Sequence, residues 1–386
     1  MIDCCINGHF IAIMHKERHF RQTNMTIPQR TDNYESTTLQ AVDFFCGGGG
    51  MTCGLRMAGI DVLGGVDIAA DCKKTYEFNN SPARFVQRDV SSLDAESMSD
   101  IFNIRRDNPQ LLFVGCSPCQ YWSKIRTDRG KSEKSAFLLK EFQRLIKAFL
   151  PGFVILENVP GLRNNARSYL PNFLKFLTHT GYSFDDDVID TSRYGVPQHR
   201  HRYLLMASRT GMAVTLPEGG ETAVTVRQVI GEENGFPRIE AGHADDTEFM
   251  HTAANLSPLN LRRIQTTPHD GGDRLSWKDD LDLQIDAYKG RDKIFKDVYG
   301  RIRWDTPAPT ITTRFHSLSN GRFGHPEEDR ALSLREGACL QTFPKDYRFF
   351  GTSRDSVARQ IGNAVPPLLA RHIGTHLMRL TRHGDL

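Results

Sequence analysis

Short apolar segments alternate with helical patterns between residues 40 and 160, and this alternation limits the possible folds more than any other feature. The segments predict strands at 41–45, 62–66, 83–87, 111–114 and 153–156. Glycine-rich turns and helical patterns separate them, most clearly the amphipathic pattern of 134–150. Repeated strand–helix units predict an α/β fold built on a doubly wound, mostly parallel sheet.

The patterning weakens after about Thr210. Residues 212–300 are rich in Gly, Asp, Glu and Arg and contain few apolar runs. Regular patterning returns near Ala331 and in a helix expected at about 367–380. We therefore predict a smaller, irregular domain that interrupts the α/β domain.

The expected boundaries follow from these changes. The α/β domain covers 38–211 and is completed by 356–386, and the irregular domain covers 212–355. Residues 1–37 show no periodic pattern, so we expect an N-terminal extension that is partly disordered.

Composition and charge exclude several classes of protein. A formal net charge of +3 is too small by itself to indicate a nucleic-acid binder, and the 8 cysteines lack disulfide-scaffold spacing. No apolar run approaches the ~20 residues of a membrane helix. Residues 6–14 are too short and too polar for a convincing signal peptide. We expect a cytoplasmic protein without membrane contact.

A cysteine-bearing turn follows the strand expected at 111–114. The sequence continues Gly-Cys-Ser-Pro-Cys-Gln, and open α/β sheets bind ligands at this end of a parallel strand. Pro118 stiffens the turn, so we interpret Cys119 as a nucleophile. Cys116 and Cys119 could instead form a zinc or redox pair, or simply be buried. No second Cys-x-x-Cys pair exists to complete a tetrahedral zinc site.

A glycine turn, Gly47 to Gly50, follows the first expected strand and suits a nucleotide-like ligand. Asp67 ends the second strand, 67 − 47 = 20 residues after Gly47, where a carboxylate can bind ribose hydroxyls. Asp89 ends the third strand and could accept from an adenine amino group. Thr52 leaves the dinucleotide fingerprint incomplete, so we predict an adenosine compound without pyrophosphate. The alternative is a plain tight turn with two helix-capping aspartates.

Three further charged residues lie at the ends or starts of expected strands. Glu157 ends the fifth strand and should face the same crevice as Cys119. Arg200 and Arg202 stand two residues apart at the start of a strand expected at 202–207, and alternation would send both to one face. Solvated charges are the ordinary alternative for each.

Together these motifs resemble the DNA (cytosine-5) methyltransferases, and the match runs from about Val42 to the C-terminus. The motifs occur in the family's order at 43–50, 116–123, 157–159, 198–202, 309–313 and 362–367. Two departures are Gly-Cys-Ser-Pro-Cys at 115–119 and Ile68, where many relatives carry an aromatic residue. Neither removes a chemical group.

The resemblance implies roles for four residues in catalysis. Cys119 would add to C6 of cytosine, and Glu157 would contact N3 and the exocyclic amine. Arg202 would hold the O2 carbonyl, and Arg200 would steady the thiolate region or a phosphate. Since a base inside a duplex cannot reach Cys119, the cytosine would be flipped out.

The resemblance also implies S-adenosyl-L-methionine as cofactor and no metal. The residues expected to line its pocket are Phe45, Gly47, Gly49, Gly50, Asp67, Ile68, Asp89, Gly115, Pro118 and Asn363. The expected partner is double-stranded DNA, and a cognate restriction endonuclease would act separately. We expect a monomeric bacterial protein in the cytoplasm, associated with the nucleoid through DNA.

Sequence recognition is expected in the irregular domain. The loop His269 to Arg274 could approach a groove or phosphates, or be a plain surface turn. Candidates for phosphate or base contacts are Arg262, Arg263, Arg301, Arg303, Arg314 and Arg322.

Three rival functions remain open from the residues. The first is a tRNA cytosine-5 methyltransferase, against which the long segment 213–305 argues. The second is a non-catalytic DNA-binding relative, against which the intact Cys119 and its partners argue. The third is a nicotinamide-dependent oxidoreductase, which Thr52 disfavours.

Overall fold

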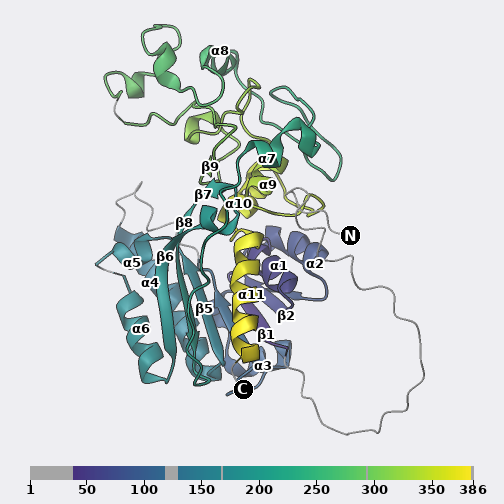
Figure 1. Ribbon diagram of the computed structural model, residues 1–386, viewed down its shortest axis with the longest axis vertical. Coiled ribbons are helices and arrows are strands. Elements are labelled where there is room, and N and C mark those ends of the chain that lie inside the picture. The colour runs from purple at the N-terminus through teal and green to yellow at the C-terminus, as the bar shows by residue number, and fades with distance from the viewer. Residues whose placement is uncertain (1–37, 118–128, 167, 293, 384–386) are drawn as a thin grey trace, which may run out of the picture.

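The computed structural model describes residues 38–117, 129–166, 168–292 and 294–383, with an α/β part below and a smaller, irregular part above it (Figure 1). Pro118 and Cys119 therefore lie outside the described residues, as does the expected extension 1–37. No helix in the described ranges is long and apolar enough to span a membrane.

A seven-stranded sheet forms the α/β part, in the order β3-β2-β1-β4-β5-β8-β6. The strands are β1 (Gln40–Phe44), β2 (Asp61–Asp67), β3 (Arg84–Gln87), β4 (Leu111–Gly115), β5 (Phe153–Asn158), β6 (Ser183–Asp190) and β8 (His201–Ser208). Strands β1 to β5 pair in parallel, whereas β8 runs antiparallel to both β5 and β6. The predicted doubly wound, mostly parallel sheet is confirmed.

The edge strand β6 was not predicted from the sequence. It contains three consecutive aspartates, Asp185 to Asp187, and pairs only with β8. Its residues are half-buried or exposed, because an edge strand faces solvent along one side. A strand of this kind carries no apolar run by which the sequence could reveal it.

Helices cover both faces of the sheet, and an apolar core lies between each helical layer and the strands. One layer contains α1 (Gly50–Met57), α2 (Lys73–Asn80) and α11 (Pro367–His383); the other contains α3 (Ala95–Phe102), α4 (Arg129–Phe149) and α6 (Leu170–His179). In α11, Leu369, Ile373 and Leu377 recur every four residues and are buried against the sheet. The last helix of the chain thus completes the α/β part.

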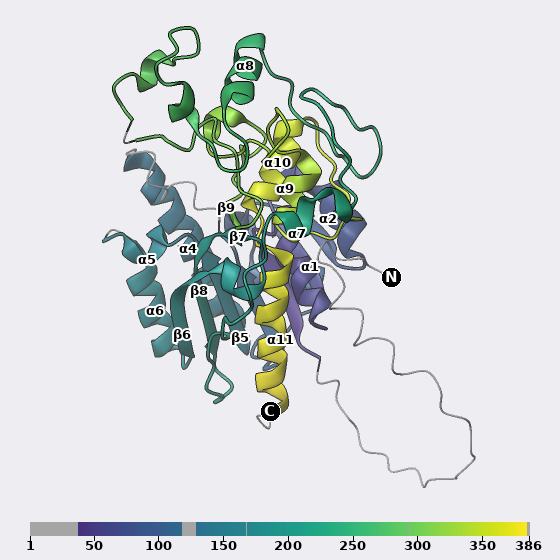
Figure 2. The same ribbon diagram turned by 45° about the horizontal axis from the view of Figure 1, so that its top comes forward.

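The smaller part joins the sheet through β7 (Gln198–His199), which pairs in parallel with β9 (Ala308–Pro309) (Figure 2). Its helices are α7 (Arg227–Ile230), α8 (Pro258–Thr266), α9 (Leu334–Leu340) and α10 (Arg354–Asn363), and α5 (Gly161–Asn164) lies in the α/β part. A separate apolar core holds α7, α9 and α10 together, with Ile361 of α10 fully buried in it. The division at 355 and 356 remains a prediction.

Candidate active site

The carboxyl ends of β1 and β4 define the crevice of the α/β part. These strands are neighbours, but the chain continues from β1 to β2 on one side and from β4 to β5 on the other. Phe44 pairs with Gly115 at their ends, and the Cys116 amide donates to the Phe44 carbonyl at 3.1 Å. Open α/β sheets bind ligands where the strand order reverses in this way. Of the predicted site residues, Phe45 directly follows β1 and Gly115 ends β4.

The glycine turn after β1 has a conformation that suits its glycines. Phe45, Gly47 and Gly49 all have positive φ, at 62°, 51° and 89°. A side chain on Gly49 would also lie 2.9 Å from the Tyr347 hydroxyl. The turn is therefore both left-handed and tightly packed, and it leads directly into the N-terminus of α1 at Gly50.

Asp67 is held at the crevice by backbone donors. The amides of Gly47 and Ala69 each donate to its carboxylate at 2.8 Å. Burial raises the pKa of this carboxyl despite those donors. Each carboxylate oxygen retains a second acceptor position, and the neighbouring Ile68 is 67% exposed. A carboxylate beside an exposed apolar side chain fits the ribose and base of an adenosine compound.

Asp89 caps a short 3-10 helix, Val90–Ser92. Its Oδ1 accepts from the amide and the hydroxyl of Ser91, at 2.9 and 2.8 Å. One oxygen of Asp89 therefore caps a helix, as the alternative interpretation expected. Contact of Asp89 with an adenine remains a prediction. Asn363, the last residue of α10, is exposed.

Glu157 and Arg202 form an ion pair at the ends of adjacent strands. Nε of Arg202 lies 3.0 Å from Oε1 of Glu157, and the two side chains are only 14% and 9% exposed. Burial raises the pKa of Glu157, while the charges of Arg202 and Arg200 oppose that rise. Oε1 of Glu157 receives no well-directed hydrogen bond from the described residues. Among the described residues, the contact of Glu157 with Arg202 is therefore chiefly a charge pair.

Arg200 has a different environment from Arg202. It is buried, and its guanidinium donates to the carbonyls of Ile311, Gly362 and Ala364 at 2.9, 3.1 and 3.1 Å. Arg200 lies between β7 and β8, and it thereby bonds the residues on both sides of Asn363. In the structure Arg200 therefore braces the backbone, since its guanidinium holds three carbonyls together. The expected contact of Arg200 with a thiolate or phosphate remains a prediction.

Ser117 is the last described residue before Cys119, and Asn158 fixes it. Nδ2 of Asn158 donates to the carbonyl and hydroxyl of Ser117, at 3.2 and 3.1 Å. Ser117, two residues before Cys119 in the sequence, is therefore hydrogen-bonded to the residue that follows Glu157. Burial raises the pKa of the Cys116 thiol, which disfavours Cys116 as a thiolate nucleophile. Asn158 received no role from the sequence beyond its place in a motif.

A second buried group escaped the sequence analysis. Thr52 donates its hydroxyl proton to Oδ2 of Asp43 at 2.7 Å, and its oxygen lies 3.0 Å from the Tyr76 hydroxyl. Burial raises the pKa of Asp43 to about 7. The signal in the sequence is Thr52 itself, which occupies the third glycine position of the dinucleotide fingerprint. At that position Thr52 donates a hydrogen bond to a buried carboxyl, whereas a glycine would let the helix pack closely on the strand.

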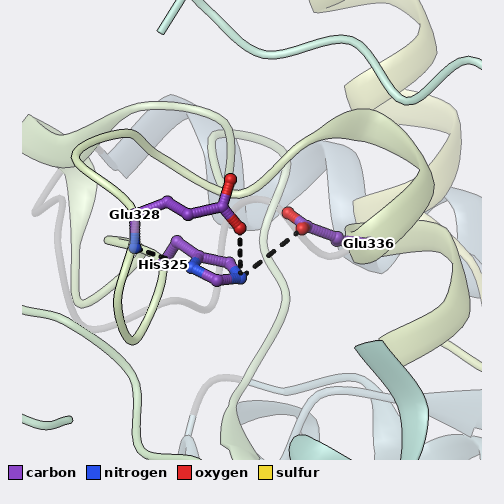
Figure 3. Close-up of side chains that lie close together, drawn as sticks. All are labelled: His325, Glu328 and Glu336. Carbon is purple, nitrogen blue, oxygen red and sulfur yellow. Dashed lines mark hydrogen bonds and ion pairs between the residues drawn. The ribbon is translucent and has the colours of Figure 1, made fainter. Parts of the chain in front are cut away.

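His325, Glu328 and Glu336 gather in the smaller part (Figure 3). The backbone amides of Glu327 and Glu328 donate to Nδ1 of His325, so its proton lies on Nε2, 3.2 Å from Glu328. A protonated Nε2 has no lone pair for a metal. Arg330 also bonds both carboxylates, at 3.0 and 2.7 Å. The cluster is therefore a buried ion-pair network.

The fold is an α/β sheet with a glycine turn at the end of β1 and a buried carboxyl–arginine pair at the ends of β5 and β8. Residues 39–379 match the family model for C-5 cytosine-specific DNA methylases. The chain belongs to this family and is a DNA cytosine-5 methyltransferase, which confirms the resemblance seen in its motifs.

Two curated relatives and a solved structure are similar to this chain over most of its length. The type II methylase M.HgiDII of Herpetosiphon aurantiacus is 39% identical over 88% of this chain and 94% of that protein. The type II methyltransferase M1.HphI of Haemophilus parahaemolyticus is 30% identical over 89% and 87%. A structure described as a prophage-encoded DNA modification methyltransferase from E. coli has a TM-score of 0.67 at 24% identity, covering 90% of this chain and all of that one. That structural likeness shows the fold.

Proposed function

We propose that this protein methylates C5 of a flipped-out cytosine in a specific double-stranded DNA sequence, through a covalent bond between Cys119 and C6. The observation that carries the proposal is the buried Glu157–Arg202 pair, and Asn158, the residue after Glu157, bonds Ser117, which precedes Cys119 by two residues in the sequence. A carboxyl and a guanidinium at this spacing match the N3, amine and O2 positions along one edge of cytosine.

The protein's own groups would act on the ring in sequence. Arg202 would donate to O2, and Glu157 would bond N3 and the exocyclic amine, so charge developing on the ring is stabilised as the thiolate adds to C6. That addition makes C5 nucleophilic. After methylation, removal of the C5 proton and cleavage of the bond between C6 and sulfur restore the ring and the Cys119 thiolate.

S-adenosyl-L-methionine would supply the electrophilic methyl group and leave as S-adenosyl-L-homocysteine. The crevice suits its adenosine part, since Asp67 can accept from ribose hydroxyls and Ile68 offers an exposed apolar surface. The other described residues that we expect to line the pocket are Phe45, Gly47, Gly49, Gly50, Gly115 and Asn363. Asp89 is proposed to accept from the adenine amine.

The names of the relatives extend the proposal. Several are type II methyltransferases, so we propose that this protein is the modification enzyme of a bacterial restriction–modification system. A cognate endonuclease would act separately on the same sequence, and the methyltransferase would act as a monomer in the cytoplasm. Plasmid DNA isolated from cells that express the protein should resist digestion by the cognate endonuclease. This digestion tests the proposed restriction–modification role.

Bisulfite sequencing of plasmid from expressing cells tests the reaction and reveals the target. We expect C5 methylation at one recurring sequence, and none with the C119S variant. A duplex with 5-fluorocytosine at the target should become covalently attached to wild-type protein in the presence of S-adenosylmethionine. Methylation that persists in C119S would overturn the mechanism, and methylation of tRNA instead of duplex DNA would overturn the substrate.

A further inference from the structure

Several arginines of the smaller part are already committed to its own fold. They are Arg263, Arg274, Arg301, Arg322 and Arg330, whose guanidiniums bond backbone carbonyls and carboxylates. Arg301 is the clearest case, because it is 0% exposed. A base could reach these donors only if internal bonds were broken. Three of the six arginines considered from the sequence, Arg263, Arg301 and Arg322, are therefore poor candidates for reading DNA.

Arg303 differs from them. It is exposed, and its side chain lies against Gly271 in the loop whose role the sequence left open. A Cβ built on Gly271 would lie 2.6 Å from Cζ and 2.7 Å from Nε of Arg303. The contact exists because residue 271 has no side chain, and φ of +103° there favours glycine as well. Gly271 therefore gives the Arg303 guanidinium a flat backbone surface on which to lie.

The loop under Arg303 is fixed by hydrogen bonds. The Asp270 amide donates to the Pro326 carbonyl at 2.8 Å, and Asp270 Oδ1 accepts from the Trp304 amide at 2.7 Å. Nη1 of Arg322 donates to the Gly271 carbonyl at 2.9 Å. A guanidinium lying on a fixed loop loses less conformational freedom on binding than one on a free side chain. This favours contact with a base edge, where two hydrogen bonds need a defined orientation.

The chain path limits how far Arg303 can lie from the proposed catalytic pair. It precedes β9 by 308 − 303 = 5 residues, so its backbone lies within about 18 Å of that strand. Strand β9 pairs with β7, and Arg202 follows β7 by 202 − 199 = 3 residues. Base pairs spaced about 3.4 Å apart beside a flipped cytosine fall within this range.

We propose that Arg303 determines target specificity by donating two hydrogen bonds to O6 and N7 of a guanine in the recognised sequence. The inference rests on the proposed function for the DNA target, and it assigns one position of that target to one side chain. Arginine is suited to this contact because its planar fork matches the guanine edge, whereas lysine offers a single point charge.

The test compares R303A and R303K with wild type on the target duplex and on duplexes with one base pair changed. Binding and methyl transfer are measured separately. For R303A we expect a roughly 10- to 100-fold loss of discrimination at one G·C position. R303K should lose discrimination there while keeping most of its affinity. R238A is the control, because Arg238 is an exposed arginine paired to Glu232 and Glu327 in the same part.

Other outcomes overturn the inference. If R303A discriminates like wild type, Arg303 reads no base. If R303K keeps full discrimination, a single point-charge donor is sufficient and the two-bond contact is wrong. A wild-type protein that binds one sequence without methylating it would refute the proposed reaction, while binding still tests Arg303.

Two glycine-to-alanine variants give an independent test. G271A should push the guanidinium away and reproduce the specificity loss of R303A. G235A is the control, because Gly235 has φ of +77° but nothing within 4 Å of an added Cβ. Thermal melting establishes that each variant folds. If both glycine variants discriminate like wild type, the positioning role of Gly271 is wrong.

Discussion

Nε of Arg202 lies 3.0 Å from Oε1 of Glu157, and this pair joins the carboxyl end of β5 to the antiparallel strand β8. Both side chains are nearly buried, and the Glu157 oxygen has no well-directed donor. We have proposed that this pair binds the cytosine ring, and the first prediction tests that role.

Replacing Arg202 by alanine should reduce the rate of methyl transfer. The variant loses the donor proposed for the cytosine O2, and loss of one such donor costs about 100- to 1,000-fold in kcat. Single-turnover methylation with saturating DNA measures the effect. H201A is the control, since His201 is the adjacent residue and its side chain is 61% exposed. A wild-type rate for R202A would contradict the proposed role.

Replacing Arg200 by alanine should destabilise the protein. The buried carbonyls of Ile311 and Gly362 would lose this donor, while the Ala364 carbonyl would keep Gln341 as a donor; loss of such a buried network costs about 3 kcal/mol. The free energy of unfolding in urea should fall for R200A and remain near wild type for H199A, whose side chain is 55% exposed. If R200A loses activity at unchanged stability, Arg200 acts on the reaction directly and the bracing role is secondary.

Asp43 should make stability depend on pH. Its pKa is about 7 in the folded protein and 3.8 as an ordinary carboxyl, so between these values the folded state holds a proton that the unfolded state has lost. This contribution is complete below pH 3.8 and disappears as pH rises through 7. At about 1.4 kcal/mol per pH unit, the window amounts to roughly 4 kcal/mol.

The D43N variant isolates that effect. The difference in unfolding free energy, wild type minus D43N, should fall between pH 4 and 7 and then level off. Urea titrations at several pH values measure it. A difference that stays constant across this window would show that Asp43 titrates as an ordinary carboxyl.

Replacing Gly115 by alanine should destabilise the end of β4. An added Cβ would lie 2.7 Å from the Phe142 ring of α4, and overpacking of this kind costs about 1–3 kcal/mol. F142L provides the space, so the G115A/F142L double variant should recover part of the loss attributable to G115A. Unfolding free energies of the four proteins form a double-mutant cycle. Strict additivity would mean that the ring is not the obstacle.

Replacing Glu336 by glutamine should destabilise the smaller part. The variant leaves the buried guanidinium of Arg330 without its closest carboxylate, at a cost of about 3–5 kcal/mol. Arg330 holds the pKa of Glu336 below its usual range, so this stabilisation is present above about pH 4.5 and is lost as pH falls further. Zn²⁺ should not raise the melting temperature. A zinc-dependent rise would mean that the cluster binds metal.

The sequence by itself determined the sheet and the placement of the site acids. Apolar runs bounded by turns predict buried parallel strands, and Asp67 and Glu157 directly follow or end such runs, so both lie along the same edge of the sheet. The edge strand β6 was hidden because its aspartates follow no apolar pattern. Its position depends on pairing with β8, which is a long-range contact.

Only the tertiary structure decided what each arginine does. In the sequence, Arg200 and Arg202 look equivalent, as do Arg301 and Arg303. In the fold, Arg200 and Arg301 are buried among carbonyls, whereas Arg202 contacts a carboxylate and Arg303 lies exposed on a glycine. The physical reason is that a guanidinium bonds whichever acceptors the fold brings within about 3 Å, and those acceptors come from segments distant in sequence.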